Sequence, residues 1–77
     1  MNPPNAILHE LLNLAEIMLT NGAEVSRVEE TLNRMGRAYG ATQMNVFAIT
    51  SSIVVTMVFE EGEEYTQTRR ITTPVGT

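Results

Sequence analysis

The spacing of apolar residues changes at Gly40, and this change constrains the fold more than any other feature of the sequence. Before Gly40 the apolar residues recur every three or four positions, which is the period of an amphipathic helix. After Gly40 they alternate every second position, which is typical of strands with one buried face. The chain is therefore predicted to place helices first and a sheet second.

The helical half divides into two predicted helices near Asn21 and Gly22. Consecutive prolines in Met1–Pro4 predict irregular structure there, so Asn5 is the expected N-cap of the first helix. Gly22 is the expected left-handed residue that ends it. Its main apolar stripe comprises Ile7, Leu8, Leu11, Leu12, Ala15, Met18 and Leu19. Leu14 and Ile17 widen this surface, which predicts cover on two sides.

The second predicted helix has two possible starts and ends at Gly40. Asn21 with Glu24, and Ser26 with Glu29, both have the spacing of a capping box. The earlier start is preferred because it places Glu24 in the positive first turn. The helix has a narrow apolar seam suited to one partner surface, made of Val25, Val28, Leu32, Met35 and Tyr39.

The alternating half contains three predicted strands, Met44–Ile49, Ile53–Phe59 and Tyr65–Ile71. The second is almost entirely apolar or β-branched, which predicts a strand that is central or covered on both faces. The third is polar enough to be an edge or to face something polar, and Thr72–Thr77 has no periodic pattern. Short connections favour an antiparallel meander. The predicted class is α+β, with both N-terminal helices packed on one face of a three-stranded sheet.

The shortness of the chain predicts that it needs a partner. Folding of a domain this small buries only about 60% of the surface exposed when unfolded. The 77 residues include no cysteine, which excludes a stabilising disulfide or thiolate metal site. The sheet face opposite the helices would expose apolar side chains. We therefore expect a dimer, or a missing element of the same protein, to cover them.

The charge of the chain excludes several partners. Nine glutamates and five arginines give a net charge of −4, which argues against a nucleic acid or an anionic membrane surface as a partner. No apolar run approaches the roughly 20 residues that cross a bilayer. No basic segment of a signal peptide precedes the first helix. We expect a soluble, cytoplasmic piece.

Few residues point to catalysis or metal binding. His9 is the only histidine and has no cysteine or aspartate with which to form a local metal site, so we interpret it as a solvated helix residue. Ser51 and Ser52 could be nucleophiles, although serines are common in turns. A small hydrolase is thus the least favoured alternative, and no catalytic residue, metal or cofactor is predicted.

Glu24, Arg27 and Glu29 lie near the predicted start of the second helix. Unpaired backbone N–H groups there favour an anion, and Arg27 could bind the carboxylate of a small acid or amino acid. Capping and surface ion pairs are the alternative, which the physical argument alone favours. Arg69 and Arg70 could likewise form ordinary ion pairs with Glu63, Glu64 or the acidic face of a helix.

Several segments together resemble the threonine/serine exporter family. They are Asn21–Thr31, Arg34, Ala38–Gly40, Asn45–Thr50, Ile53–Thr56 and Thr68–Ile71. Members of this family are bacterial membrane proteins in which such a region precedes a bundle of transmembrane helices. Many relatives carry a Thr-Pro-Thr-Gly-like turn where this chain has Ile49–Ser52, so a role of that turn does not carry over.

The resemblance implies that residues 1–77 are a soluble N-terminal domain or fragment, preceding a further helix and a membrane region. It would lie at the cytoplasmic face of the inner membrane and contribute assembly, gating or substrate handling to export of threonine, serine or a related small metabolite. Implied partners are a second copy, the membrane part, or a small amino acid bound by Glu24, Arg27, Glu29 and Arg69. The alternative is a structural dimerisation module without a ligand.

Overall fold

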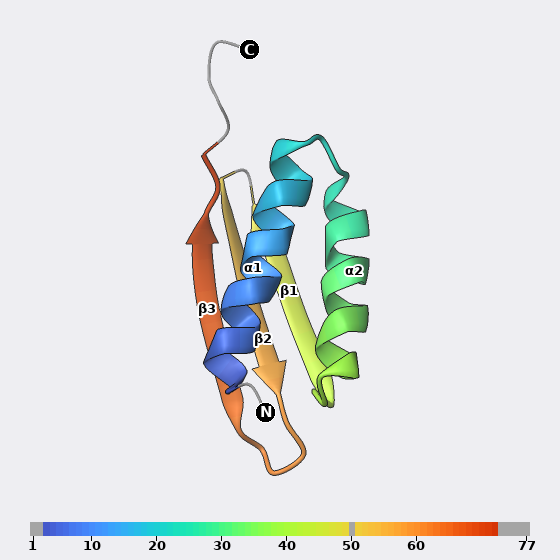
Figure 1. Cartoon of the computed structure of the whole chain (residues 1–77), viewed down its shortest axis with the longest axis vertical. Coiled ribbons are helices and arrows are strands. Elements are labelled where there is room, and N and C mark those ends of the chain that lie inside the picture. Colours follow the sequence, from blue (N-terminus) through green and yellow to red (C-terminus); the bar gives the residue numbers. More distant parts are fainter. Residues whose placement is uncertain (1–2, 50, 73–77) are drawn as a thin grey trace.

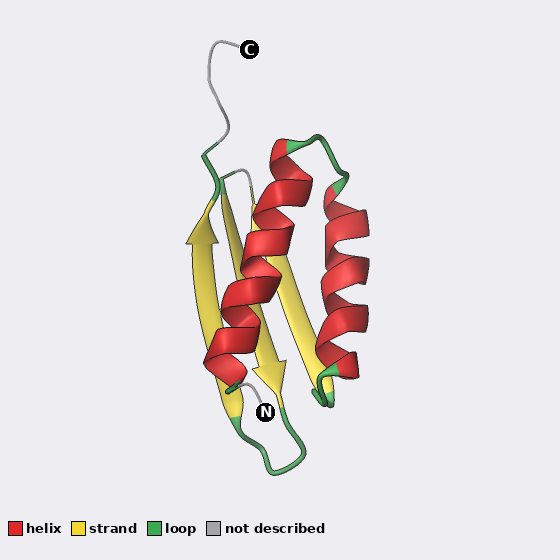
Figure 2. Ribbon diagram, viewed as in Figure 1, coloured by secondary structure: helices red, strands yellow, loops and turns green. Residues whose placement is uncertain are grey.

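Two helices lie side by side on one face of a three-stranded sheet (Figures 1 and 2). The computed structural model describes residues 3–49 and 51–72. Its elements are α1 (Pro4–Thr20), α2 (Val25–Ala38), β1 (Gln43–Ile49), β2 (Ser52–Val58) and β3 (Glu64–Arg70). Neighbouring strands are antiparallel and the sheet order is β1-β2-β3. The predicted α+β class and meander are therefore confirmed.

The arrangement places specific helices over specific strands. α1 packs on β3 and β2, whereas α2 packs on β1. The β1–β2 turn and the α1–α2 connection lie at one end of the molecule, and the β2–β3 loop lies at the other (Figure 1). β2 is central and β3 is an edge, as predicted. Thr50 of the β1–β2 turn and residues 73–77 of the predicted tail lie outside the described residues.

The first helix begins earlier than the sequence predicted. Pro4 is its first residue and Pro3, not Asn5, is its N-cap. The carbonyl oxygen of Pro3 accepts hydrogen bonds from the backbone N–H groups of Ala6 and Ile7, at 3.0 and 3.1 Å. The prediction of irregular structure was wrong at Pro4, because the first turn of a helix does not need the N–H group that proline lacks and the fixed φ of proline suits the helix. Met1 and Asn2 of that predicted segment lie outside the described residues.

The connection between the helices follows the predicted turn but not the predicted caps. Gly22 has a φ of 89°, in the left-handed region, as expected. α2 begins at Val25 with Glu24 as N-cap and without a side-chain capping hydrogen bond. The side chain of Asn21 instead donates to the carbonyl oxygen of Ile17 at 2.7 Å, at the end of α1. Neither predicted capping box forms.

The core lies between the helix layer and the sheet. Its fully buried large side chains are Leu8, Leu11, Leu12, Val28, Leu32, Ile53, Val55 and Met57. The predicted seam of α2 holds only in its middle, because Val25 and Tyr39 at its ends are 44% and 51% exposed. The wide apolar surface of α1 is likewise incompletely covered, since Ile17 is 59% exposed. The sequence therefore predicted correctly which face of each helix is buried, but it overestimated how many residues of that face are covered.

The sheet face opposite the helices has no cover within residues 3–49 and 51–72. Phe47, Val54 and Thr68 lie in one row across the three strands, and Ile49, Ser52 and Arg70 form another. Phe47 is 62% exposed and Ile49 is 57% exposed. This confirms the predicted exposure of apolar side chains. We call this surface the open sheet face.

Candidate functional site

Arg69 links the edge strand β3 to α1. One guanidinium nitrogen, Nη1, lies 2.8 Å from Glu16 Oε1 and 2.9 Å from Asn13 Oδ1. The other, Nη2, lies 3.4 Å from His9 Nδ1. Alternation along β3 turns the Arg69 side chain toward the helix layer, where it is 20% exposed. This is the one ion pair among residues 3–49 and 51–72. It gives Arg69 a structural role, because the side chain joins β3 to α1.

Glu24 and Arg27 lie at the start of α2, beside a shallow hollow of about 250 Å³. Ser26 and Glu30 complete its lining. The backbone N–H groups of Arg27 and Val28 are already bonded to the carbonyl oxygen of Glu24, at 3.0 and 3.1 Å. The hollow thus brings one guanidinium and two carboxylates onto the first turns of a helix.

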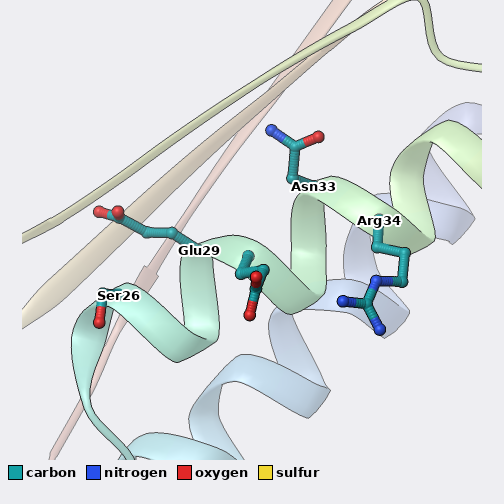
Figure 3. A pocket seen from close by; sticks show the side chains of 5 residues that line it. Ser26, Glu29, Asn33 and Arg34 are labelled. Atoms are coloured by element: carbon teal, nitrogen blue, oxygen red, sulfur yellow. The ribbon is translucent and has the colours of Figure 1, made fainter.

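Glu29 borders a neighbouring hollow of about 420 Å³ on the same helix. Ser26, Asn33 and Arg34 lie along it, and Figure 3 shows their side chains spaced along the helix rather than converging on one point. No hydrogen bond or ion pair of the described residues joins Arg69 to Glu24, Arg27 or Glu29. The structure therefore places Arg27 and Glu29 on α2, Glu24 at the N-cap of α2, and Arg69 against α1.

The geometry gives no support to the hydrolase alternative. His9 projects from α1 on one side of the sheet, near Arg69. Ser52 alternates with the buried Ile53, which places the Ser52 side chain on the open sheet face. The sheet thus lies between His9 and Ser52. Within the described part of the chain, no group of three histidine, cysteine or acidic residues could hold a metal ion.

A larger groove, which the sequence did not reveal, lies at the end of the molecule that carries the β2–β3 loop. We call it the end groove. Its volume is about 740 Å³, and three aromatic rings and three carboxylates line it. The complete lining is Pro4, Ile7, Tyr39, Gly40, Phe59, Glu60, Glu61, Glu63 and Tyr65. The segment Phe59–Tyr65, with glutamates between two aromatic residues, was the available signal. Tyr39 joins it only through the tertiary fold.

Comparison with known proteins identifies the family. The family model described as "Putative threonine/serine exporter" matches residues 9–77, which is nearly the whole chain. The chain belongs to the threonine/serine exporter family. No curated protein and no solved structure matches it.

Membership of the exporter family agrees with the prediction that the chain is not an enzyme. The family's function implies a membrane part, but neither helix of the described residues is sufficiently long and apolar to span a bilayer. The described residues thus form a small α+β domain with three surface features that could bind a partner or a ligand. These candidate binding surfaces are the open sheet face, the two hollows along α2 and the end groove.

Proposed function

We propose that this chain is an assembly domain of a threonine/serine exporter, in which two copies pair through their open sheet faces. The observation that carries the proposal is the exposure of Phe47 and Ile49, at 62% and 57%, on a sheet face that no described helix covers. Exposed apolar patches of this kind mark interaction surfaces. Val54 and Val58 of the central strand extend the patch.

The charges on the open sheet face suit a two-fold arrangement. Glu64 and Arg70 lie at opposite ends of β3, and their side chains are on the open face because they alternate with inward-facing residues. The middle row of the sheet is Val46, Val55 and Gln67. A two-fold axis running across the strands at this row would place Glu64 opposite Arg70 of the partner subunit, twice per dimer.

The size of the face predicts a weak dimer. Three strands of seven residues, with about 4.8 Å between strands and about 3.3 Å per residue, form a face of about 14 by 23 Å. That is about 330 Å² in projection, well below the roughly 800 Å² of accessible surface that each partner buries in a standard interface. Attachment to a shared membrane assembly would raise the effective concentration to the millimolar range and favour pairing.

Sedimentation of the chain from about 20 µM to about 2 mM tests this proposal, because tethered pairing needs only millimolar affinity. We expect the average mass to rise with concentration, and Phe47→Thr to remove the rise. Ile17→Thr is the matched control, since Ile17 is similarly exposed but lies on α1. Association abolished by Ile17→Thr but retained by Phe47→Thr would instead assign the interface to the helix layer. A strict monomer at every concentration would refute pairing of the chain.

Substrate handling at α2 is a second proposal. Threonine and serine carry both a carboxylate and an ammonium group, and the hollow lined by Glu24, Arg27 and Glu30 offers partners for both. Glu29 lies on the adjoining hollow, whereas Arg69 could take part only by leaving Glu16. Titration with threonine, followed by backbone amide shifts, is the test. We expect shifts in residues 22–29, and their absence at millimolar threonine would contradict this site.

A further inference from the structure

The end groove combines an aromatic wall with an acidic rim. The rings of Phe59 and Tyr65 are in edge-to-face contact, with centroids 5.9 Å apart and an interplanar angle of 74°. Tyr39, which is 51% exposed, supplies a third ring from the end of α2. Glu60, Glu61 and Glu63 of the β2–β3 loop add the carboxylates. The volume of about 740 Å³ is within the range of ligand pockets, about 300–1,000 Å³.

No arginine lines this groove, so no side chain of residues 3–49 and 51–72 gives its carboxylates a cationic partner within it. Arg37 is the arginine nearest to Tyr39 in the chain, but its guanidinium is held by Asn33 Oδ1 at 2.7 Å and by the carbonyl oxygen of Thr42 at 3.2 Å. The N-terminal end of α1 and the C-terminal end of α2 both border the groove, and their partial charges have opposite signs. Because the contributions of the two helix ends oppose each other, the glutamates make the electrostatic potential of the groove negative.

We propose that the end groove binds an arginine side chain from a basic segment of the exporter's own membrane part. A guanidinium can stack on an aromatic ring while it pairs with a carboxylate, and the groove places both kinds of group together. Membrane proteins concentrate lysine and arginine in cytoplasmic loops beside their spans, which makes a basic segment available. The proposal rests on the family membership and on the cytoplasmic position expected for the chain, and it is independent of pairing through the open sheet face.

The same chemistry disfavours a free amino acid in the groove. The carboxylate of threonine or serine would face Glu60, Glu61 and Glu63 with no arginine to receive it. An arginine within a peptide chain has no such carboxylate. The groove therefore selects a cationic side chain over a zwitterionic substrate.

The experiment titrates the isotope-labelled chain with an acetylated and amidated peptide of two arginines separated by glycines. A peptide with glutamine at both arginine positions is the matched control. We expect the arginine peptide to shift the amides of Tyr39, Gly40 and residues 59–65, with weaker binding as salt rises. The glutamine peptide should leave these amides in place.

Two variants test the groove without threatening the fold, because the altered residues are exposed. Glu60→Gln combined with Glu61→Gln should weaken arginine-peptide binding about five-fold, and Tyr39→Leu should weaken it about three-fold. Glu10→Gln is the control, because it removes an exposed carboxylate of α1 that does not line the groove, and it should change binding by less than about two-fold. Unchanged amide positions in the core would show that each variant remains folded.

Several results would overturn the proposal. They are a loss of binding in Glu10→Gln as large as in the Glu60→Gln and Glu61→Gln double variant, equal shifts by the glutamine peptide, and no shift at about 10 mM arginine peptide, a concentration typical of effective concentrations in tethered assemblies. Shifts of the same amides by free threonine would instead make the groove a substrate site. None of these outcomes changes the result expected for the sedimentation of Phe47→Thr. The groove proposal and the dimer proposal can therefore be refuted independently.

Discussion

Met44 fills the space in which a side chain at Gly36 would begin. A Cβ added to Gly36 would overlap Sδ, Cε and Cγ of Met44, so the absence of a side chain lets α2 approach β1 closely. Both residues are buried. This contact positions α2 over the sheet, and with it both hollows of that helix.

Gly36→Ala is therefore expected to destabilise the fold. Alanine favours a helix interior by about 1 kcal/mol over glycine, but overpacking a filled site costs about 1–3 kcal/mol. We expect a net loss of about 1 kcal/mol in the free energy of unfolding, measured by urea denaturation. Met44→Ala should cost less in the Gly36→Ala background than in the original chain, as measured by a double-mutant cycle, and strict additivity would show that the two residues do not clash.

Gly22→Ala should destabilise the fold through the backbone alone. Nothing lies within 4 Å of the position a Cβ would occupy, yet φ is 89°. Left-handed backbone costs a residue with a Cβ about 1 kcal/mol relative to glycine. Thermal unfolding should show this loss, and Gly22→Asn should lose less because asparagine tolerates this conformation. An unchanged midpoint for alanine would contradict the strained geometry.

Arg69 and Arg70 form a matched pair for testing the contact between β3 and α1. Arg69→Gln removes the ion pair with Glu16 and should lower the free energy of unfolding by about 1 kcal/mol, as expected for a partly buried charged hydrogen bond. Arg70→Gln alters an exposed residue on the opposite face and should change it by less than about 0.5 kcal/mol. Equal effects in urea denaturation would contradict the structural role of Arg69.

Charge reversal tests the two-fold geometry proposed for the dimer. Glu64→Arg alone, or Arg70→Glu alone, should weaken association because each places like charges opposite one another. The double variant restores opposite charges and should recover most of the association. Sedimentation across the same concentration range provides the measurement. Failure of the double variant to recover would argue for another arrangement of the two faces.

The helices and strands were predictable because each has its own apolar period and most have recognisable ends. Gly22 ends α1 in the left-handed conformation, as expected from local chemistry. The capping boxes were not predictable in the same way, because several side chains could satisfy the same backbone groups. Glu24 became an N-cap without a side-chain hydrogen bond, and Asn21 turned back to α1.

The candidate sites were less predictable than the elements that carry them. Glu24 and Arg27 border one hollow because three residues span nearly one helical turn, whereas Glu29, two positions after Arg27, borders another. Arg69 is distant from them in the sequence, and its partner, Glu16, could not be chosen over other glutamates by charge alone. The end groove was missed because its rings come from Tyr39, Phe59 and Tyr65, on separate elements.

The sequence by itself determined the order of helices and strands, the antiparallel connection, the central place of β2 and the apolar character of the open sheet face. These properties follow from local periods and short connections. Only the tertiary structure decided that α1 covers β3, that α2 covers β1, and that an aromatic and acidic groove forms at one end. A period specifies which face of an element is buried, but packing between distant segments specifies what that face meets.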